Sequence, residues 1–80
     1  MQFFVYILLN PHGRFYIGQT SNLKLRLQRH NDGKVFSTKS HRPWKLVYSE
    51  QFDTRSEAIS RERHLKGLKS KRVLQALIAQ

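Results

Sequence analysis

Residues 2–18 read QFFVYILLNPHGRFYIG, and this stretch decides the fold. Residues 2–9 are continuously apolar after Gln2 and rich in aromatic and β-branched types, which predicts a strand buried on both faces. Asn10-Pro11-His12-Gly13 then predicts a tight turn with its glycine in the left-handed conformation. Residues 14–18 follow as an antiparallel strand, so the stretch is expected to form a β-hairpin.

The length of the hairpin loop decides which face each tyrosine occupies. With a three-residue loop, which we expect, Tyr6 lies opposite Gly18. Leu8 then faces Tyr16, so the two tyrosines share one face and lie within reach of each other. A four-residue loop would put them on opposite faces, because side chains alternate along a strand.

The segment after the hairpin predicts a helix with one buried side. Thr20 or Ser21 is expected to cap this helix, which runs to about Asn31 and ends at Asp32-Gly33. At about 100° per residue, the inner side carries Leu23, Arg26, Leu27 and His30, and the outer side carries Lys24, Gln28 and Arg29.

Residues 34–52 predict a loop followed by a third strand. Residues 34–43 are polar, basic and rich in turn formers, which is typical of a loop. Residues 44–52 alternate well enough for a strand. One face of this strand is expected to carry Trp44, Leu46 and Tyr48.

Two more helices are expected after the third strand. Thr54-Arg55-Ser56-Glu57 fits a capping box, in which the glutamate reaches back to the threonine amide. This helix is expected to end at Leu65 or Lys66, before Gly67. Ser70 is expected to cap the last helix, whose core stripe consists of Val73, Leu74, Leu77 and Ile78.

The predicted order is strand, strand, helix, strand, helix, helix. This order favours the α+β class, with a small three-stranded antiparallel sheet flanked by three helices. A chain of 80 residues is expected to form one domain, residues 1–80. The absence of cysteine excludes disulfides and cysteine-based zinc sites, and it fits a reducing compartment, so we expect a cytoplasmic protein.

The charge balance predicts a polyanionic partner. Lys and Arg together number 15 and Asp and Glu number 5, which gives a net charge of +10. Such an excess in a short chain favours nucleic acid. No apolar run is long enough to span a membrane, and we expect no membrane partner. The alternatives are a solvated cationic surface and a basic face that docks an acidic protein.

Glu62 is the first candidate for chemistry. On a helical wheel it lies between Ala58 and Leu65, on the apolar side of its helix. A carboxylate near a core face needs a partner, because an isolated buried charge is very unfavourable. A divalent metal would supply that partner, since hard cations take oxygen ligands. An ion pair with a neighbouring Arg or Lys is the alternative.

Four further side chains have the chemistry that phosphate handling needs. Arg26 and His30 are neighbours on a helix, where arginine stabilises phosphate charge and histidine shuttles protons. Tyr6 and Tyr16 carry phenols that can act in proton transfer near a cation. The alternative for all four is a structural role at the core or its boundary. Contacts to a phosphate backbone are expected from basic residues of the loop and the later turn: Lys39, Lys66, Lys69, Lys71 and Arg72.

Together these residues resemble the GIY-YIG nuclease family. Val5-Tyr6-Ile7 sits where the family has its first motif, and Tyr16-Ile17-Gly18 matches the second. Residues 20–31, with their Arg and His, are similar to the family's first helix. Residues 58–66, AISRERHLK, resemble the helix that presents a metal-binding glutamate. The match covers nearly the whole chain and is closest to small single-domain bacterial members, similar to the nuclease module of excision-repair and homing enzymes.

The resemblance implies hydrolysis of a DNA phosphodiester bond with one divalent cation, Mg²⁺ or Mn²⁺, held by Glu62. Tyr6 would help deprotonate the attacking water, and Tyr16 and Arg26 would position and neutralise the phosphate. His30 would assist proton transfer or contact the phosphate. Gly18 would let the backbone turn closely beside the site and would contact the nucleic acid. The expected substrates are branched or damaged DNA in repair or recombination, with a protein partner supplying specificity.

The sequence departs from the family pattern at three points. Val5 replaces the glycine of the first motif, and Gln19 stands where many members carry a lysine. No counterpart of the asparagine that larger relatives carry after the glutamate helix is present. The alternative function is therefore a nucleic-acid-binding module on the same fold, with weak or lost catalysis.

Overall fold

The computed structural model describes residues 1–80 and contains three strands and three α-helices. None of the helices is both long enough and apolar enough to cross a membrane. The observed order β-β-α-β-α-α and the antiparallel sheet confirm the predicted α+β class. The elements are β1 (Phe3–Leu9), β2 (Phe15–Thr20), α1 (Leu23–Asn31), a 3₁₀ turn (Lys39–His41), β3 (Lys45–Phe52), α2 (Arg55–Leu68) and α3 (Lys71–Ile78).

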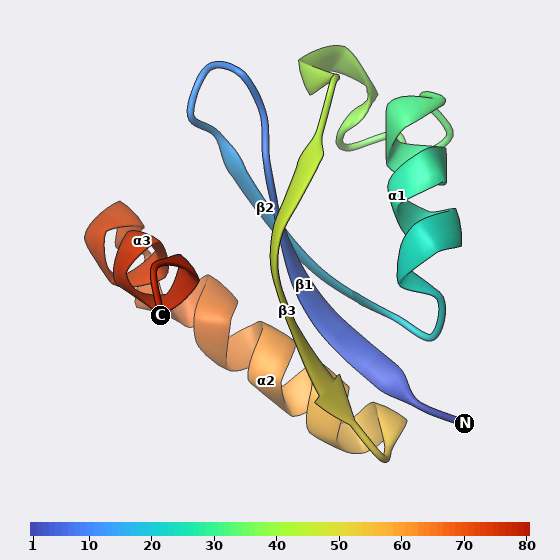
Figure 1. Ribbon diagram of the computed structural model, residues 1–80, viewed down its shortest axis with the longest axis vertical. Helices are drawn as coiled ribbons and strands as arrows, with labels where there is room; N and C mark the ends of the chain where they lie inside the picture. The colour runs from blue at the N-terminus through green and yellow to red at the C-terminus, as the bar shows by residue number, and fades with distance from the viewer.

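Strand β1 is the centre of a sheet ordered β2-β1-β3, and helices cover both of its faces. Figure 1 shows α1 on one side of the sheet and α2 and α3 on the other. Val5 and Ile7 belong to the core beneath α2 and α3, whereas Tyr6 and Leu8 pack with α1. All four side chains are buried, which confirms the predicted strand buried on both faces.

The hairpin has the predicted three-residue loop. Its register places Tyr6 opposite Gly18. Gly13 has a φ of +82°, and its amide donates to the Asn10 carbonyl at 3.1 Å. Tyr6 and Tyr16 therefore share the face beneath α1, with their ring centroids 6.4 Å apart. This register fixes the position of the candidate site.

Strand β3 contains a β-bulge, which the alternating pattern of apolar residues in residues 44–52 did not indicate. Tyr48 and Leu46 pair with consecutive residues of β1, so Val47 is the extra residue. The bulge turns Tyr48 towards α2, whereas Leu46 stays with Trp44 on the α1 side. The prediction that these three side chains share one face is therefore wrong for Tyr48. The strand also begins at Lys45, one residue later than expected.

Two helix ends differ from the prediction. Asn22, not Thr20 or Ser21, caps α1 and accepts a hydrogen bond from an amide of the first turn. Thr20 is instead the last residue of β2, and its hydroxyl accepts a hydrogen bond from the Asn22 amide at 3.1 Å. Helix α2 continues through Gly67, and Lys69 takes the left-handed C-cap conformation with a φ of 50°. Gly67 therefore does not end the helix.

The start of each C-terminal helix is as predicted. Thr54 and Glu57 form the reciprocal capping box of α2, and the Ser70 hydroxyl accepts from the Val73 amide at the start of α3. Val73 is 44% exposed, so its place in the predicted core stripe is wrong. The rest of the stripe packs against the sheet through Leu74, Leu77 and Ile78.

Thr54→Ala is expected to lower the free energy of unfolding by about 1 kcal/mol, because it removes the side-chain cap of α2. Chemical denaturation followed by circular dichroism measures this change. Ser56→Ala lies in the same exposed turn outside the capping box, and a change within about 0.5 kcal/mol is expected there. Equal losses in the two variants would contradict the role given to the cap.

Candidate active site

Four of the five predicted catalytic side chains touch one another beneath α1, and we name them the Tyr6 cluster: Tyr6, Tyr16, Arg26 and His30. The Tyr6 hydroxyl lies 2.9 Å from Nε2 of His30. Nε of Arg26 donates to the same hydroxyl oxygen at 3.3 Å. The Tyr16 ring packs edge-on against the His30 ring, with centroids 5.0 Å apart.

Gly18 makes room for the Tyr6 hydroxyl. A Cβ atom at this position would lie 2.5 Å from the Tyr6 oxygen, which no side chain can accommodate without displacing the tyrosine. Gly18 itself is buried in β2, directly opposite Tyr6. Its position is thus explained by close approach of the tyrosine, and its contact with nucleic acid stays a prediction.

Burial sets the protonation of the cluster. Burial raises the pKa of the Tyr6 hydroxyl, and the charges of Tyr16 and Glu62 raise it further. The hydrogen bond and the charge of Arg26 lower this pKa in part. Burial, assisted by the Arg26 charge, lowers the pKa of His30 to about 4. At neutral pH the phenol therefore keeps its proton and the imidazole is neutral.

Thr38 holds the other nitrogen of His30. Its Oγ1 lies 2.7 Å from Nδ1 of His30 and donates to the Val35 carbonyl at 3.4 Å. With the threonine proton donated to Val35, Nδ1 would carry the imidazole proton and Nε2 would accept from Tyr6. Thr38 is 1% exposed. The sequence pattern missed it, because it sits in a polar loop beside similar residues.

Asn31 and Trp44 fix the end of α1 against the start of β3. The Asn31 side chain accepts from the Trp44 amide at 2.6 Å and donates to the Trp44 carbonyl at 3.0 Å. The Trp44 indole donates to the Thr38 carbonyl at 3.0 Å. Its ring lies against Tyr16, with centroids 6.2 Å apart. These bonds lock the loop that supports His30, and no local sequence pattern indicated them.

Glu62 lies on α2, which covers the face of the sheet opposite α1. As the helical wheel predicted, its neighbours Ala58 and Leu65 are buried, and its own side chain is 19% exposed. The carboxylate pairs with Lys66 at 3.1 Å, so the ion-pair alternative is present. Its charge nevertheless acts on Tyr6, because it contributes to the raised pKa of that hydroxyl.

Glu62 and Gln19 carry oxygen donors of the kind that would fit a divalent cation held with the help of a substrate. No group of three or more His, Asp and Glu side chains could hold a metal alone. Mg²⁺ commonly takes one or two carboxylates and completes its shell with water and substrate phosphates. Glu62 supplies such a carboxylate. Gln19, next to Gly18 on β2, adds an amide oxygen that is buried without a hydrogen-bond partner.

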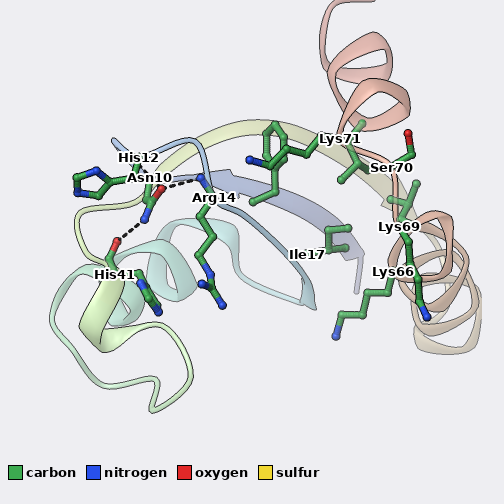
Figure 2. A pocket seen from close by; sticks show the side chains of 12 residues that line it. Asn10, His12, Arg14, Ile17, His41, Lys66, Lys69, Ser70 and Lys71 are labelled. Carbon is green, nitrogen blue, oxygen red and sulfur yellow. Dashed lines mark hydrogen bonds between the residues drawn. The ribbon is translucent and has the colours of Figure 1, made fainter.

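A groove of about 690 Å³ lies between the β1–β2 hairpin and the turn that joins α2 to α3 (Figure 2). Of the predicted nucleic-acid contacts, Lys66, Lys69 and Lys71 line this groove. Lys39 does not, because its Nζ lies over the Phe36 ring, and Arg72 is exposed on α3 outside the lining. The sequence pattern missed the cationic and titratable residues of the opposite wall: His12, Arg14 and His41.

Thr38→Val is expected to lower the free energy of unfolding by about 1–3 kcal/mol, because it leaves the buried Nδ1–H of His30 without an acceptor. Urea denaturation measures the loss. Thr38→Ser keeps the hydroxyl and is expected to retain most of the stability. A valine variant as stable as the wild type would show that the Thr38–His30 bond is not formed.

His30 is expected to make stability fall as pH drops from about 6.5 to 4, by up to about 3 kcal/mol. Between these pH values the imidazole of the unfolded chain binds a proton and the imidazole of the folded chain does not. The full contribution of His30 to stability is therefore present above about pH 6.5. Urea denaturation across this range compares wild type with His30→Asn, which should lose this part of the pH dependence. His64→Asn, at an exposed position, is the control and should retain it.

The chain has clear relatives among known proteins. Residues 2–75 match the family model of the GIY-YIG catalytic domain. UPF0213 proteins of Staphylococcus saprophyticus and Staphylococcus aureus are each 41% identical over 64 residues, which cover 79% of this chain and 78% of theirs. The solution NMR structure of a UPF0213 protein from Bacillus halodurans aligns with 99% of this chain and 84% of that chain, with a TM-score of 0.62 and 31% identity. The chain therefore belongs to the GIY-YIG family of nuclease domains.

Proposed function

We propose that this protein is a metal-dependent endonuclease that hydrolyses DNA phosphodiester bonds at the Tyr6 cluster and Glu62. One observation carries the proposal: the Tyr6 hydroxyl is bonded both to neutral His30 and to the charged Arg26. A proton acceptor and a cation thus meet at one oxygen. Membership of a nuclease family and a net charge of +10 support a DNA substrate.

Tyr6 is placed to relay a proton from the attacking water. Its oxygen accepts from Arg26, and its own proton points to Nε2 of His30. As the water oxygen bonds to phosphorus and the leaving oxygen departs, the water proton passes to Tyr6 and the tyrosine proton passes to His30. The transfers are concerted with the attack, because burial disfavours a free phenolate. The leaving oxygen takes a proton from solvent. Burial also disfavours the imidazolium formed on His30, which therefore returns its proton through Tyr6 to solvent when the product leaves.

Arg26 and Tyr16 are assigned to the scissile phosphate. The hydrogen bond to Tyr6 raises the already high pKa of Arg26, so the guanidinium is charged throughout the working range. A guanidinium stabilises the charge that grows on phosphate oxygens. Glu62 would hold one Mg²⁺ or Mn²⁺ ion, which when bound stabilises charge on the same phosphate. Lys66, whose side chain is 53% exposed, is free to leave Glu62 for a phosphate.

The setting that we propose is repair or recombination at branched or damaged DNA. Basic side chains that contact the phosphate backbone carry no sequence information, which supports a protein partner that supplies specificity. The absence of cysteine fits an enzyme of the cytoplasm.

Wild-type protein is expected to cleave plasmid and branched DNA with Mg²⁺ or Mn²⁺ and to stop in chelator. Tyr6→Phe and Glu62→Gln are expected to lower the rate by about 100-fold or more, because each removes a group that acts on the reacting atoms. Matched controls are Tyr48→Phe, whose hydroxyl bonds Glu50, and Asp53→Asn, an exposed carboxylate. Gel assays of nicked and linear products measure the rates.

The outcomes separate the candidate functions. Equal nicking by the wild type and Glu62→Gln would show that the site is wrongly assigned. Salt-sensitive DNA binding without cleavage would instead indicate the binding module on the same fold. DNA binding weaker than binding to an acidic protein would favour a protein-docking surface.

A further inference from the structure

The groove between the β1–β2 hairpin and the α2–α3 turn has cations on both walls and no carboxylate in its lining. Arg14 comes from the hairpin wall. Figure 2 shows its side chain and that of Lys66 extending from opposite walls of the groove. Lys69 and Lys71 add two more charges beside the N-terminus of α3, where the helix dipole is also positive. This field favours a polyanion over a neutral or cationic ligand.

Hydrogen bonds hold one wall of the groove in place. The buried Asn10 side chain accepts from the Arg14 amide at 2.8 Å and donates to the His41 carbonyl at 3.2 Å (Figure 2). These bonds tie the hairpin to the 3₁₀ turn. From the other wall, Lys71 reaches towards the hairpin, since a Cβ atom at Gly13 would lie 3.9 Å from its Nζ. The shape of the groove is therefore set by the fold.

Apolar side chains form the floor of the groove. A site that binds only phosphate does not need such a floor. Phe15 and Ile17 of β2 form part of it, together with Leu65 and Leu74 from the helices. Sites for single-stranded nucleic acid combine a cationic track with aromatic faces on which bases stack. The partly buried Phe15 offers such a face. The volume is that of a small-molecule site, which gives room for one or two nucleotides.

We propose that this groove binds a single-stranded segment of the polynucleotide next to the cleaved bond. This inference rests on the proposed nuclease function and extends it to a substrate class: DNA with a flap, a gap or a splayed end. Lys66 connects the two sites, because it lines the groove and also pairs with Glu62. Phosphates lie on Arg14, Lys69 and Lys71, and a base lies against Phe15.

Binding in chelator tests the proposal without cleavage. The probes are a fluorescent oligothymidylate and a duplex of equal length, followed by anisotropy at several salt concentrations. Arg14→Gln/Lys71→Gln removes two groove cations, and Lys24→Gln/Arg29→Gln removes an equal charge from exposed positions of α1. The groove variant is expected to bind the single strand about tenfold more weakly and to reduce its salt slope by about 1.4, at about 0.7 per phosphate. The α1 variant is expected to change neither by more than twofold.

Phe15→Leu provides a second, charge-independent test. Loss of base stacking is expected to weaken single-strand binding about fivefold or more without changing the salt slope. Circular dichroism melting identifies any variant that fails to fold. Equal weakening by both charge variants would overturn the proposal, as would a duplex bound as tightly and with the same variant dependence. Binding of fluorescent polyglutamate by the wild type, weakened in the groove variant, with no binding of the single strand would instead assign the groove to an acidic protein. Since no cleavage is measured, an inactive Tyr6 cluster would leave these results unchanged.

Discussion

The hydrogen bond between the Tyr6 hydroxyl and Nε2 of His30 joins the central strand to α1, and the two side chains are only 2% and 0% exposed. Each partner needs the other, because a buried polar group left unpaired costs about 1–3 kcal/mol. The same burial keeps the phenol protonated and the imidazole neutral at physiological pH. Gly18 opens the space for this bond, and Thr38 bonds the other nitrogen of the imidazole. Stability and the proposed proton relay therefore depend on one contact.

Strand β2 serves two different sites because its side chains alternate. Tyr16 faces α1 and joins the Tyr6 cluster, whereas Phe15 and Ile17 face the opposite side and form the floor of the basic groove. An edge strand suits this use, since only β1 pairs with it. On the α2 side, Glu62 and Lys66 stand one helical turn apart and link the groove to the proposed metal ligand. The proposed cleavage site and the proposed strand-binding groove are thus neighbours in the fold.

Much of this architecture follows from local sequence rules. The hairpin register could be predicted because an Asn-Pro-His-Gly loop restricts the turn, and that register brings Tyr6 and Tyr16 together. The capping box of α2 and the buried side of Glu62 follow equally from helix rules. The bulge at Val47 could not be predicted, because residues 44–52 alternate as a regular strand would. Thr38, Asn31 and Arg14 were missed because their roles depend on distant partners.

We propose that Glu62 and the Tyr6 cluster act together as one site, with the metal ion held by Glu62. Paramagnetic broadening by Mn²⁺ in a ¹H–¹⁵N NMR spectrum tests it most directly, since this effect falls steeply with distance from the ion. On titration with Mn²⁺, signals of Glu62, Tyr6 and Tyr16 are expected to broaden together, and Glu62→Gln is expected to abolish the effect. Broadening centred on other carboxylates, or unchanged in Glu62→Gln, would contradict the account.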